Sequence, residues 1–168
     1  MRNLLWSFTI ILACHLIVYA VYAADTDLNY KERVRSLFDH AFVKGFMGNA
    51  FPLDELDPLE CKGVGYDVKL GEKNPEQLIN GGFMLTLVDS LSTIGVIHGE
   101  DALLTYANKF IKTFKGFDID NNVLTFEVNI RVLAGLLSAH DLLVTVYKNK
   151  EYKGELLKIA VELGDRLL

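Results

Sequence analysis

Glu127, Asn129 and Arg131 place an acid, an amide and a base inside the apolar run VLTFEVNIRVLAGLLS, residues 123–138. Apolar residues recur along this run with the period of a helix, so Glu127 and Arg131, four residues apart, share one face above small side chains. A carboxylate beside a guanidinium is a candidate for acid–base or binding chemistry. The same spacing is typical of an ordinary stabilising ion pair on a solvent-facing helix. Spacing alone leaves both interpretations open.

Asp89 is a second unusual charge, because residues 77–97 have the pattern of a helix that is apolar almost all round. Such a helix is expected to be buried on most sides, and removing a lone carboxylate from water costs much free energy. We therefore expect Asp89 to find a partner, such as a neighbouring helix end, or to face a water-filled cavity.

Periodicity predicts the other helices that must position these groups. They cover residues 30–49, residues 101–114, a segment from possible N-caps at 120–122 to about 147, and a segment from 151 to the last residue, 168. No strand pattern of comparable length occurs, so the predicted fold class is all-α, organised as successive helix pairs. The helical pattern is unfinished at Leu168, which predicts that these residues are the front part of a longer chain.

A long loop is predicted over residues 50–75, where prolines and glycines interrupt the helical pattern. It carries the acidic residues Asp54, Glu55 and Asp57. Oxygen ligands of this kind suit Ca²⁺, but their spacing is not that of an EF-hand loop. We expect these side chains to be solvated.

Composition limits the class of protein. The chain has 168 residues, of which 51% are hydrophobic, and a formal net charge of −5. This is enough apolar material for one packed domain and too much for a disordered chain. No basic patch with interleaved aromatic residues occurs, which argues against nucleic acid as a partner. The apolar run at 83–97 is short for a membrane span.

The first 24 residues have the features of a targeting segment. Arg2 precedes an apolar run over residues 4–21, and small residues follow at Ala23 and Ala24. This pattern predicts a signal peptide at 1–24, with an uncleaved signal anchor as the alternative, and sends residues 25–168 into the secretory pathway. Of the two cysteines, only Cys61 lies outside the targeting segment. An unpaired cysteine in an oxidising compartment suggests a partner, and a luminal oxidoreductase is one candidate.

Five motifs in order carry a resemblance over nearly all of residues 30–168: FDHAF, AFPLDELDPLEC, LTLVDSLST, FDIDNNV and FEVNIRVLAGLLSAH. Together they resemble the start of the family 47 α-mannosidases, and most closely the endoplasmic-reticulum degradation-enhancing branch. The resemblance implies that residues 25–168 are an incomplete N-terminal portion of an (α/α)7 barrel. It also implies an inverting, Ca²⁺-containing glycosidase that trims α-1,2-linked mannose from high-mannose N-glycans. Such trimming marks misfolded glycoproteins for degradation, in the endoplasmic reticulum lumen or at its membrane.

By the motif match, Glu127 takes the place of the family's general acid, and Arg131 that of an active-site arginine that holds substrate or orders water. Asp89 matches the first acidic position of the family's Asp-Ser/Ala-Leu-Asp-Thr signature, as a supporting or substrate-binding residue. The chain departs from the family at Ser92, where the second acid of that signature stands, and at Ala134, where a glycine is usual. We expect the extra methyl of Ala134 to crowd a close helix contact.

The parts of the family's site that this sequence lacks limit the prediction. In the family, Ca²⁺ is held near the far end of the catalytic domain, and the water-activating base also comes from a part without counterpart here. His40, His98 and His140 have no ligand spacing and are interpreted as ordinary helix residues, so no metal ligand is expected in this chain.

Three functional alternatives remain. An inverting glycosidase needs two carboxyl groups about 6.5–9.5 Å apart, and Glu127 supplies one. We therefore expect a mannosidase by family, although these 168 residues alone should not hydrolyse glycans. A barrel that lacks more than half of its helix pairs is predicted to leave the apolar run at 83–97 uncovered, which would favour association. The alternatives are a glycan-binding adaptor without catalysis, or an inactive fragment whose motifs serve packing only.

Overall fold

The computed structural model describes residues 28–65, 81–120 and 122–168, which form parts of two compact units, one up to Asp39 and one from His40 to Leu168. The first unit contains helix α2 (Leu28–Phe38). The predicted targeting segment at 1–24 lies outside the described residues. The helical elements that follow are η1 (Asp39–Phe46), α3 (Met47–Asn49), α5 (Leu85–His98), α6 (Glu100–Thr113), α7 (Thr125–Glu127), η3 (Val128–Leu133), α8 (Ala134–Asp141), η4 (Leu142–Val146) and α9 (Glu155–Leu167). The segments labelled η are π-helical.

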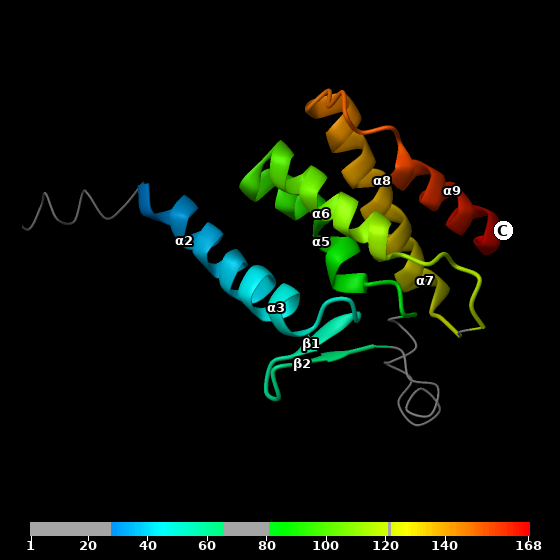
Figure 1. Cartoon of the computed structure of the whole chain (residues 1–168), viewed down its shortest axis with the longest axis horizontal. Helices are drawn as coiled ribbons and strands as arrows, with labels where there is room; N and C mark the ends of the chain where they lie inside the picture. The colour runs from blue at the N-terminus through cyan, green and yellow to red at the C-terminus, as the bar shows by residue number, and fades with distance from the viewer. Residues whose placement is uncertain (1–27, 66–80, 121) are drawn as a thin grey trace, which may run out of the picture. The chain divides into compact units, whose positions relative to one another are not determined.

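Helix α5 lies at the centre of the second unit, where it packs against α6 and α8, while α8 also packs against α9 (Figure 1). Its buried residues are Leu85, Leu87, Val88, Leu91, Ile94 and Gly95. The expectation that residues 83–97 are left uncovered is therefore wrong, because α6 and α8 cover this helix. On α5 itself, Val96 remains exposed. Several other exposed apolar side chains lie on the helix from 125 to 146 and on α9, and include Phe126, Ile130, Leu137, Val144, Leu157 and Val161.

Helix α5 begins at Leu85, whereas the predicted helix begins at residue 77. Residues 77–80 of that predicted helix lie outside the described part of the chain. Gly81, Gly82 and Met84 all have positive φ angles of 65°, 80° and 57°. A right-handed helix cannot include such residues, so the four residues before Leu85 form a turn.

Two further helix starts differ from the predictions. The helix expected to begin at 120–122 begins at Thr125, after Leu124 in an extended conformation without a side-chain cap. Helix α9 begins at Glu155 and not at 151, because Gly154 has a φ of 85°. The amides of residues 151 and 152 are bound by the Asn149 side chain at 2.9 Å, which closes a turn in place of a helix.

A small antiparallel hairpin forms inside the predicted loop. Strand β1 (Glu55–Asp57) pairs with β2 (Lys62–Val64), with Glu55 opposite Val64. Each strand has only three residues, which is too short for an alternating pattern to be recognised. The tip is closed by Asp57, whose Oδ1 accepts hydrogen bonds from the amides of Leu59 and Glu60.

The all-α class is confirmed, and the described helices form antiparallel pairs such as α5 with α6 and α8 with α9. The helix Thr125–Val146 is long and apolar enough to cross a membrane by length and composition alone. Its buried residues pack against α5 and α9, which also makes it the core helix of a helical domain.

Candidate active site

The structure brings the three residues singled out in the sequence into one cluster. Arg131 Nε donates a hydrogen bond to Glu127 Oε2 at 2.6 Å, and Arg131 Nη1 donates one to Asp89 Oδ2 at 3.1 Å. Glu127 lies one turn before Arg131 on the same helix, whereas Asp89 comes from α5, 42 residues earlier in the chain. One guanidinium therefore joins two carboxylates from two helices.

The cluster differs from an ordinary surface ion pair between Glu127 and Arg131, because it includes a third residue, Asp89, from another helix. The side chains of Asp89 and Arg131 are both 43% exposed, and that of Glu127 is 21% exposed. The partner expected for Asp89 is thus a guanidinium, and Asp89 is not a buried acid bonded to a helix end. Hydrogen bonds to Glu127, and then to Asp89, raise the pKa of Arg131 above its usual value.

The helix that carries Glu127 and Arg131 changes its hydrogen-bonding pattern at these residues. Glu127 ends α7, and Arg131 lies in the π-helical segment η3, where the Ala134 amide donates to the Asn129 carbonyl five residues back. Such segments are frequent at functional sites. Because η1 and η4 are also π-helical, this geometry does not mark the site by itself.

Close packing between α8 and α5 fixes the distance between the two helices that carry the cluster. A Cβ atom added at Gly135 would lie 2.8 Å from the Val88 carbonyl oxygen, and Val88 directly precedes Asp89. Gly135 is therefore the residue that permits this approach. Ala134 is exposed, so its methyl group does not crowd the contact, and the expectation for Ala134 is wrong.

Ser92 lies one turn after Asp89 on α5 and is partly exposed. The motif resemblance predicts an acid at this position, which would place a second carboxylate beside Asp89 on α5. In this chain the position offers a hydroxyl group, and the cluster contains two carboxylates and one guanidinium.

Asp54 is a functional candidate that sequence reasoning missed. It was expected to be solvated, but its exposure is 0%, and its carboxylate accepts hydrogen bonds from the amides of Gly82 at 2.8 Å and Leu85 at 3.0 Å. Burial raises the pKa of Asp54, and the backbone N–H groups of Leu85 and Gly82 act in the opposite direction. Glu55 is exposed and Asp57 partly so, as predicted.

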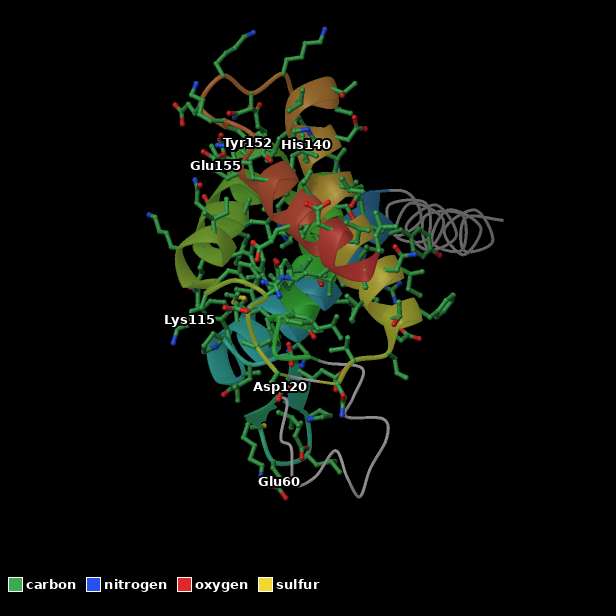
Figure 2. All side chains as sticks on the ribbon, turned by 90° about the vertical axis from the view of Figure 1, so that its right-hand side faces the viewer. Glu60, Lys115, Asp120, His140, Tyr152 and Glu155 are labelled. Carbon is green, nitrogen blue, oxygen red and sulfur yellow. The ribbon has the colours of Figure 1, made fainter. Side chains whose placement is uncertain are left out.

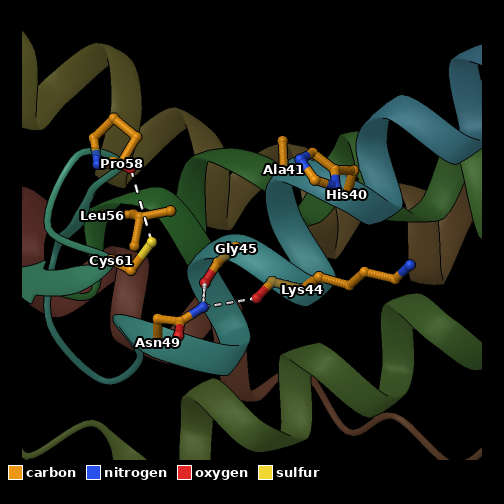
Figure 3. Close-up of a pocket in the computed structure, with 8 residues that line it drawn as sticks. All are labelled: His40, Ala41, Lys44, Gly45, Asn49, Leu56, Pro58 and Cys61. Atoms are coloured by element: carbon orange, nitrogen blue, oxygen red, sulfur yellow. Dashed lines mark hydrogen bonds between the residues drawn. The ribbon is translucent and has the colours of Figure 1, made fainter.

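Cys61 is exposed and lies at the end of the hairpin tip, with its Sγ 3.8 Å from the Pro58 carbonyl oxygen. It lines a pocket of about 430 Å³ between η1 and the hairpin (Figure 3). In the same view, the Asn49 side chain donates to the carbonyl oxygens of Lys44 and Gly45.

His140 has a structural partner. Its Nδ1 lies 3.0 Å from the hydroxyl oxygen of Tyr152, and the two side chains meet between α8 and the start of α9 (Figure 2). That hydroxyl also accepts a hydrogen bond from the Leu156 amide. The pair therefore joins α8 to α9. Within residues 28–65, 81–120 and 122–168, no group of three or more His, Cys, Asp or Glu residues is placed to hold a metal ion.

The described residues from His40 onward thus form an all-α unit of paired helices that carries a cluster of two carboxylates on one arginine. The profile of glycosyl hydrolase family 47 matches residues 37–168. The chain therefore belongs to glycosyl hydrolase family 47, whose members are α/α barrels.

Curated relatives agree with this family. The chain is 38% identical over 150 residues to ER degradation-enhancing alpha-mannosidase-like protein 1 of Schizosaccharomyces pombe, covering 82% of this chain and 18% of that protein. It is 40% identical over 147 residues to alpha-mannosidase I MNS4 of Arabidopsis thaliana, covering 86% and 21%. It is 38% identical over 150 residues to human ER degradation-enhancing alpha-mannosidase-like protein 2, covering 87% and 23%. The matched region thus spans about a fifth of each relative.

Proposed function

We propose that the protein containing this chain is an α-1,2-mannosidase that trims high-mannose N-glycans during the degradation of misfolded glycoproteins. The family match and the names of the relatives support an α-mannosidase-like role in glycan processing in the endoplasmic reticulum. The linkage, the hydrolytic step and the place in degradation are the proposal. It applies to the whole protein.

The observation that carries the proposal is the cluster of Glu127, Arg131 and Asp89. Three residues chosen from sequence motifs, on two helices, meet through two hydrogen bonds at 2.6 and 3.1 Å. An ion pair kept only for stability needs no third partner from another helix and gains little when it is this exposed. The arrangement is better explained as a site that holds a polar ligand.

Each carboxylate uses one oxygen on the arginine. Among the described residues, Glu127 Oε1 and Asp89 Oδ1 make no hydrogen bond to the protein, so both are free for a sugar hydroxyl or a glycosidic oxygen. We assign Glu127 the role of general acid, which donates its proton to the leaving oxygen as the bond to the mannose anomeric carbon breaks. Arg131 then orients Glu127 and the ligand, and Asp89 fixes Arg131 from the opposite side.

Inversion also requires a carboxylate that takes a proton from water as the water attacks the anomeric carbon. Asp89 is held on the far side of Arg131, where it serves to bind. We expect the water-activating carboxylate to come from another part of the whole protein. Ca²⁺ is implied by family, but the described residues offer no cluster of ligands for it, so no step is assigned to it here.

Localisation and partners follow from the same proposal. The substrates are high-mannose N-glycans on misfolded glycoproteins, in the endoplasmic reticulum lumen or at its membrane. The exposed thiol of Cys61 is accessible to a luminal oxidoreductase, which we keep as a proposed partner. Nucleic acid is not proposed as a partner, because the formal net charge is −5.

The second candidate function is a glycan-binding adaptor without hydrolysis. Ser92 favours it, because the family has a carboxylate at that position. Arg131 also favours it, because its guanidinium occupies one oxygen of each carboxylate in the cluster. A glycan-binding protein needs hydrogen bonds to sugar hydroxyls but no proton transfer. The cluster of Glu127, Arg131 and Asp89 offers groups for such hydrogen bonds, even with Ser92 in place of an acid.

Mannose release from a high-mannose N-glycan separates the two functions. The longest product that contains this sequence should shorten the glycan, and Glu127→Gln should lower the rate by about 10²- to 10⁴-fold, as expected for a lost general acid. Glu162→Gln is a matched control, because Glu162 forms an i,i+4 pair with Arg166 on α9 and is not a member of the cluster. Retention of the glycan without shortening, in wild type and variant alike, would favour the adaptor.

A further inference from the structure

Asp54 links the hairpin to helix α5 through its side chain and its backbone. Its carboxylate accepts hydrogen bonds from Gly82 and Leu85, which are 28 and 31 residues away in the chain, and its carbonyl oxygen accepts one from the Thr86 amide at 3.0 Å. The carboxylate is fully buried. Three bonds from one residue therefore hold the turn before α5 and its first residues.

The turn that Asp54 holds has an unfavourable backbone. Gly81 and Gly82 have positive φ angles, and so does Met84, at 57°. A non-glycine residue in this region costs free energy and persists only when its surroundings enforce it. The hydrogen bonds from Gly82 and Leu85 to Asp54 hold this turn at both of its ends, and the Phe83 ring adds an edge contact with Phe117 at 5.1 Å. No side-chain cap is present at the N-terminus of α5.

The start of α5 sets the position of Asp89. Leu85 is the first residue of the helix, and Asp89 follows one turn later on the same side. A helix is rigid over one turn, so a shift at Leu85 moves the Asp89 carboxylate relative to Arg131, which belongs to another helix. The bond from Arg131 Nη1 to Asp89 is already 3.1 Å long, so a shift of a fraction of an ångström weakens it.

We propose that Asp54 is a positioning residue of the site: by fixing the turn at 81–84 and the first turn of α5, it holds Asp89 against Arg131. It acts through α5 and does not touch a ligand itself. This positioning role depends on the proposed function in one respect, namely that Asp89 is part of the glycan site.

The guanidinium of Arg131 provides a direct readout by NMR of the ¹⁵N-labelled 168-residue chain. Nε is bonded to Glu127 on its own helix, whereas Nη1 is bonded to Asp89 on α5. In Asp54→Asn, one acceptor oxygen is replaced by an amide that cannot accept. We expect the Nη signals of Arg131 to shift toward those of Asp89→Asn, while the Nε signal stays at its wild-type position.

Asp57→Asn is the matched control. Asp57 also accepts two backbone amides on the same hairpin, but both lie in its own turn and neither belongs to α5. In this variant, the Nη and Nε signals of Arg131 should match those of the wild type. If Asp54→Asn does not fold by circular dichroism, Asp54→Glu replaces it, because this variant keeps both acceptor oxygens and moves them by one methylene group.

The outcomes are distinct. Unchanged Nη signals in a folded Asp54 variant, an equal shift of Nε and Nη, or unfolding of both variants would overturn the positioning role and leave Asp54 with general stability only. Mannose release by the longest product that contains this sequence tests the function separately. A shifted Nη signal in the 168-residue Asp54 variant, with unchanged mannose release by the same variant of the longer product, would support the positioning role and contradict the proposed function.

Discussion

Asp54 and Asp89 both serve helix α5, yet the first is fully buried and the second is nearly half exposed. Asp54 binds backbone amides, whose positions are fixed by the fold. Asp89 binds a long arginine side chain that can rotate away. The protein thus combines a rigid anchor at the start of a helix with adaptable charges one turn later, at the site where we propose that a ligand binds.

Removal of the buried anchor should have the largest effect on stability. Asp54→Ala leaves the amides of Gly82 and Leu85 without their acceptor, and an unsatisfied buried donor costs about 1–3 kcal/mol. We expect the free energy of unfolding, measured with urea, to fall by about 2 kcal/mol. Asp57→Ala, in the solvent-accessible hairpin turn, should cost less than about 1 kcal/mol. Equal losses in the two variants would mean that burial does not distinguish them.

The close contact between α8 and α5 gives the next prediction. Gly135→Ala places a methyl group 2.8 Å from the Val88 carbonyl oxygen, which must then move. Overpacking costs about 1–3 kcal/mol, and the better helix propensity of alanine offsets about 1 kcal/mol of it. Thermal unfolding should therefore show a net loss of about 1 kcal/mol. Ala134→Gly, on the exposed neighbour, should lose a similar or smaller amount through propensity alone, without a change in the Asp89–Arg131 contact.

The pH dependence of stability should distinguish the buried carboxylate of Asp54 from the exposed carboxylates. Burial raises the pKa of Asp54 above its ordinary value of 3.8, so the folded state binds the proton more tightly than the unfolded state. The resulting contribution to stability is fully present below pH 3.8 and is lost as the pH rises through the raised pKa. The slope is at most about 1.4 kcal/mol per pH unit.

The difference in unfolding free energy between wild type and Asp54→Asn isolates this contribution, because the other carboxylates cancel. The stability of the wild type relative to Asp54→Asn should be greater at acidic pH than at neutral pH. A difference that is constant with pH, or that has the opposite slope, would contradict a raised pKa.

The sequence predicted the open region better than the buried one. Glu127 and Arg131 lie on one helix, where a spacing of four residues is sufficient to predict contact. Asp89 was recognised because a charge on an apolar helix needs a partner. The identity of that partner depends on the packing of α5 against α8, which spacing within one helix does not contain.

Asp54 was misjudged for a related reason. It lies among acidic residues in a segment rich in proline and glycine, and this local composition is typical of a solvated loop. Its burial depends on residues 81–85, which approach it only after the fold has formed. The predicted helix over residues 77–97 ran through the glycines at 81 and 82. Their positive φ angles and their contact with Asp54 could not be predicted from composition.

Helix ends were predicted less well than helices. The start of α9 was placed at a charged residue, Glu151, but the Asn149 side chain binds the amides there and Gly154 turns the chain before Glu155. Ala134 and Gly135 show the same limit, because adjacent residues on one helix face solvent and a neighbouring backbone respectively. Sequence periodicity did not separate these two positions.

Arg131→Gln tests most directly whether the charged cluster is a functional site, if mannose release and unfolding are measured together on the longest product that contains this sequence. We expect at least about a 100-fold loss of mannose release, because the group that orients Glu127 and the ligand is gone. The free energy of unfolding should fall by only about 0–1 kcal/mol, since the ion pairs are partly exposed. A large loss of stability with unchanged mannose release would show that the cluster is structural and would contradict this account.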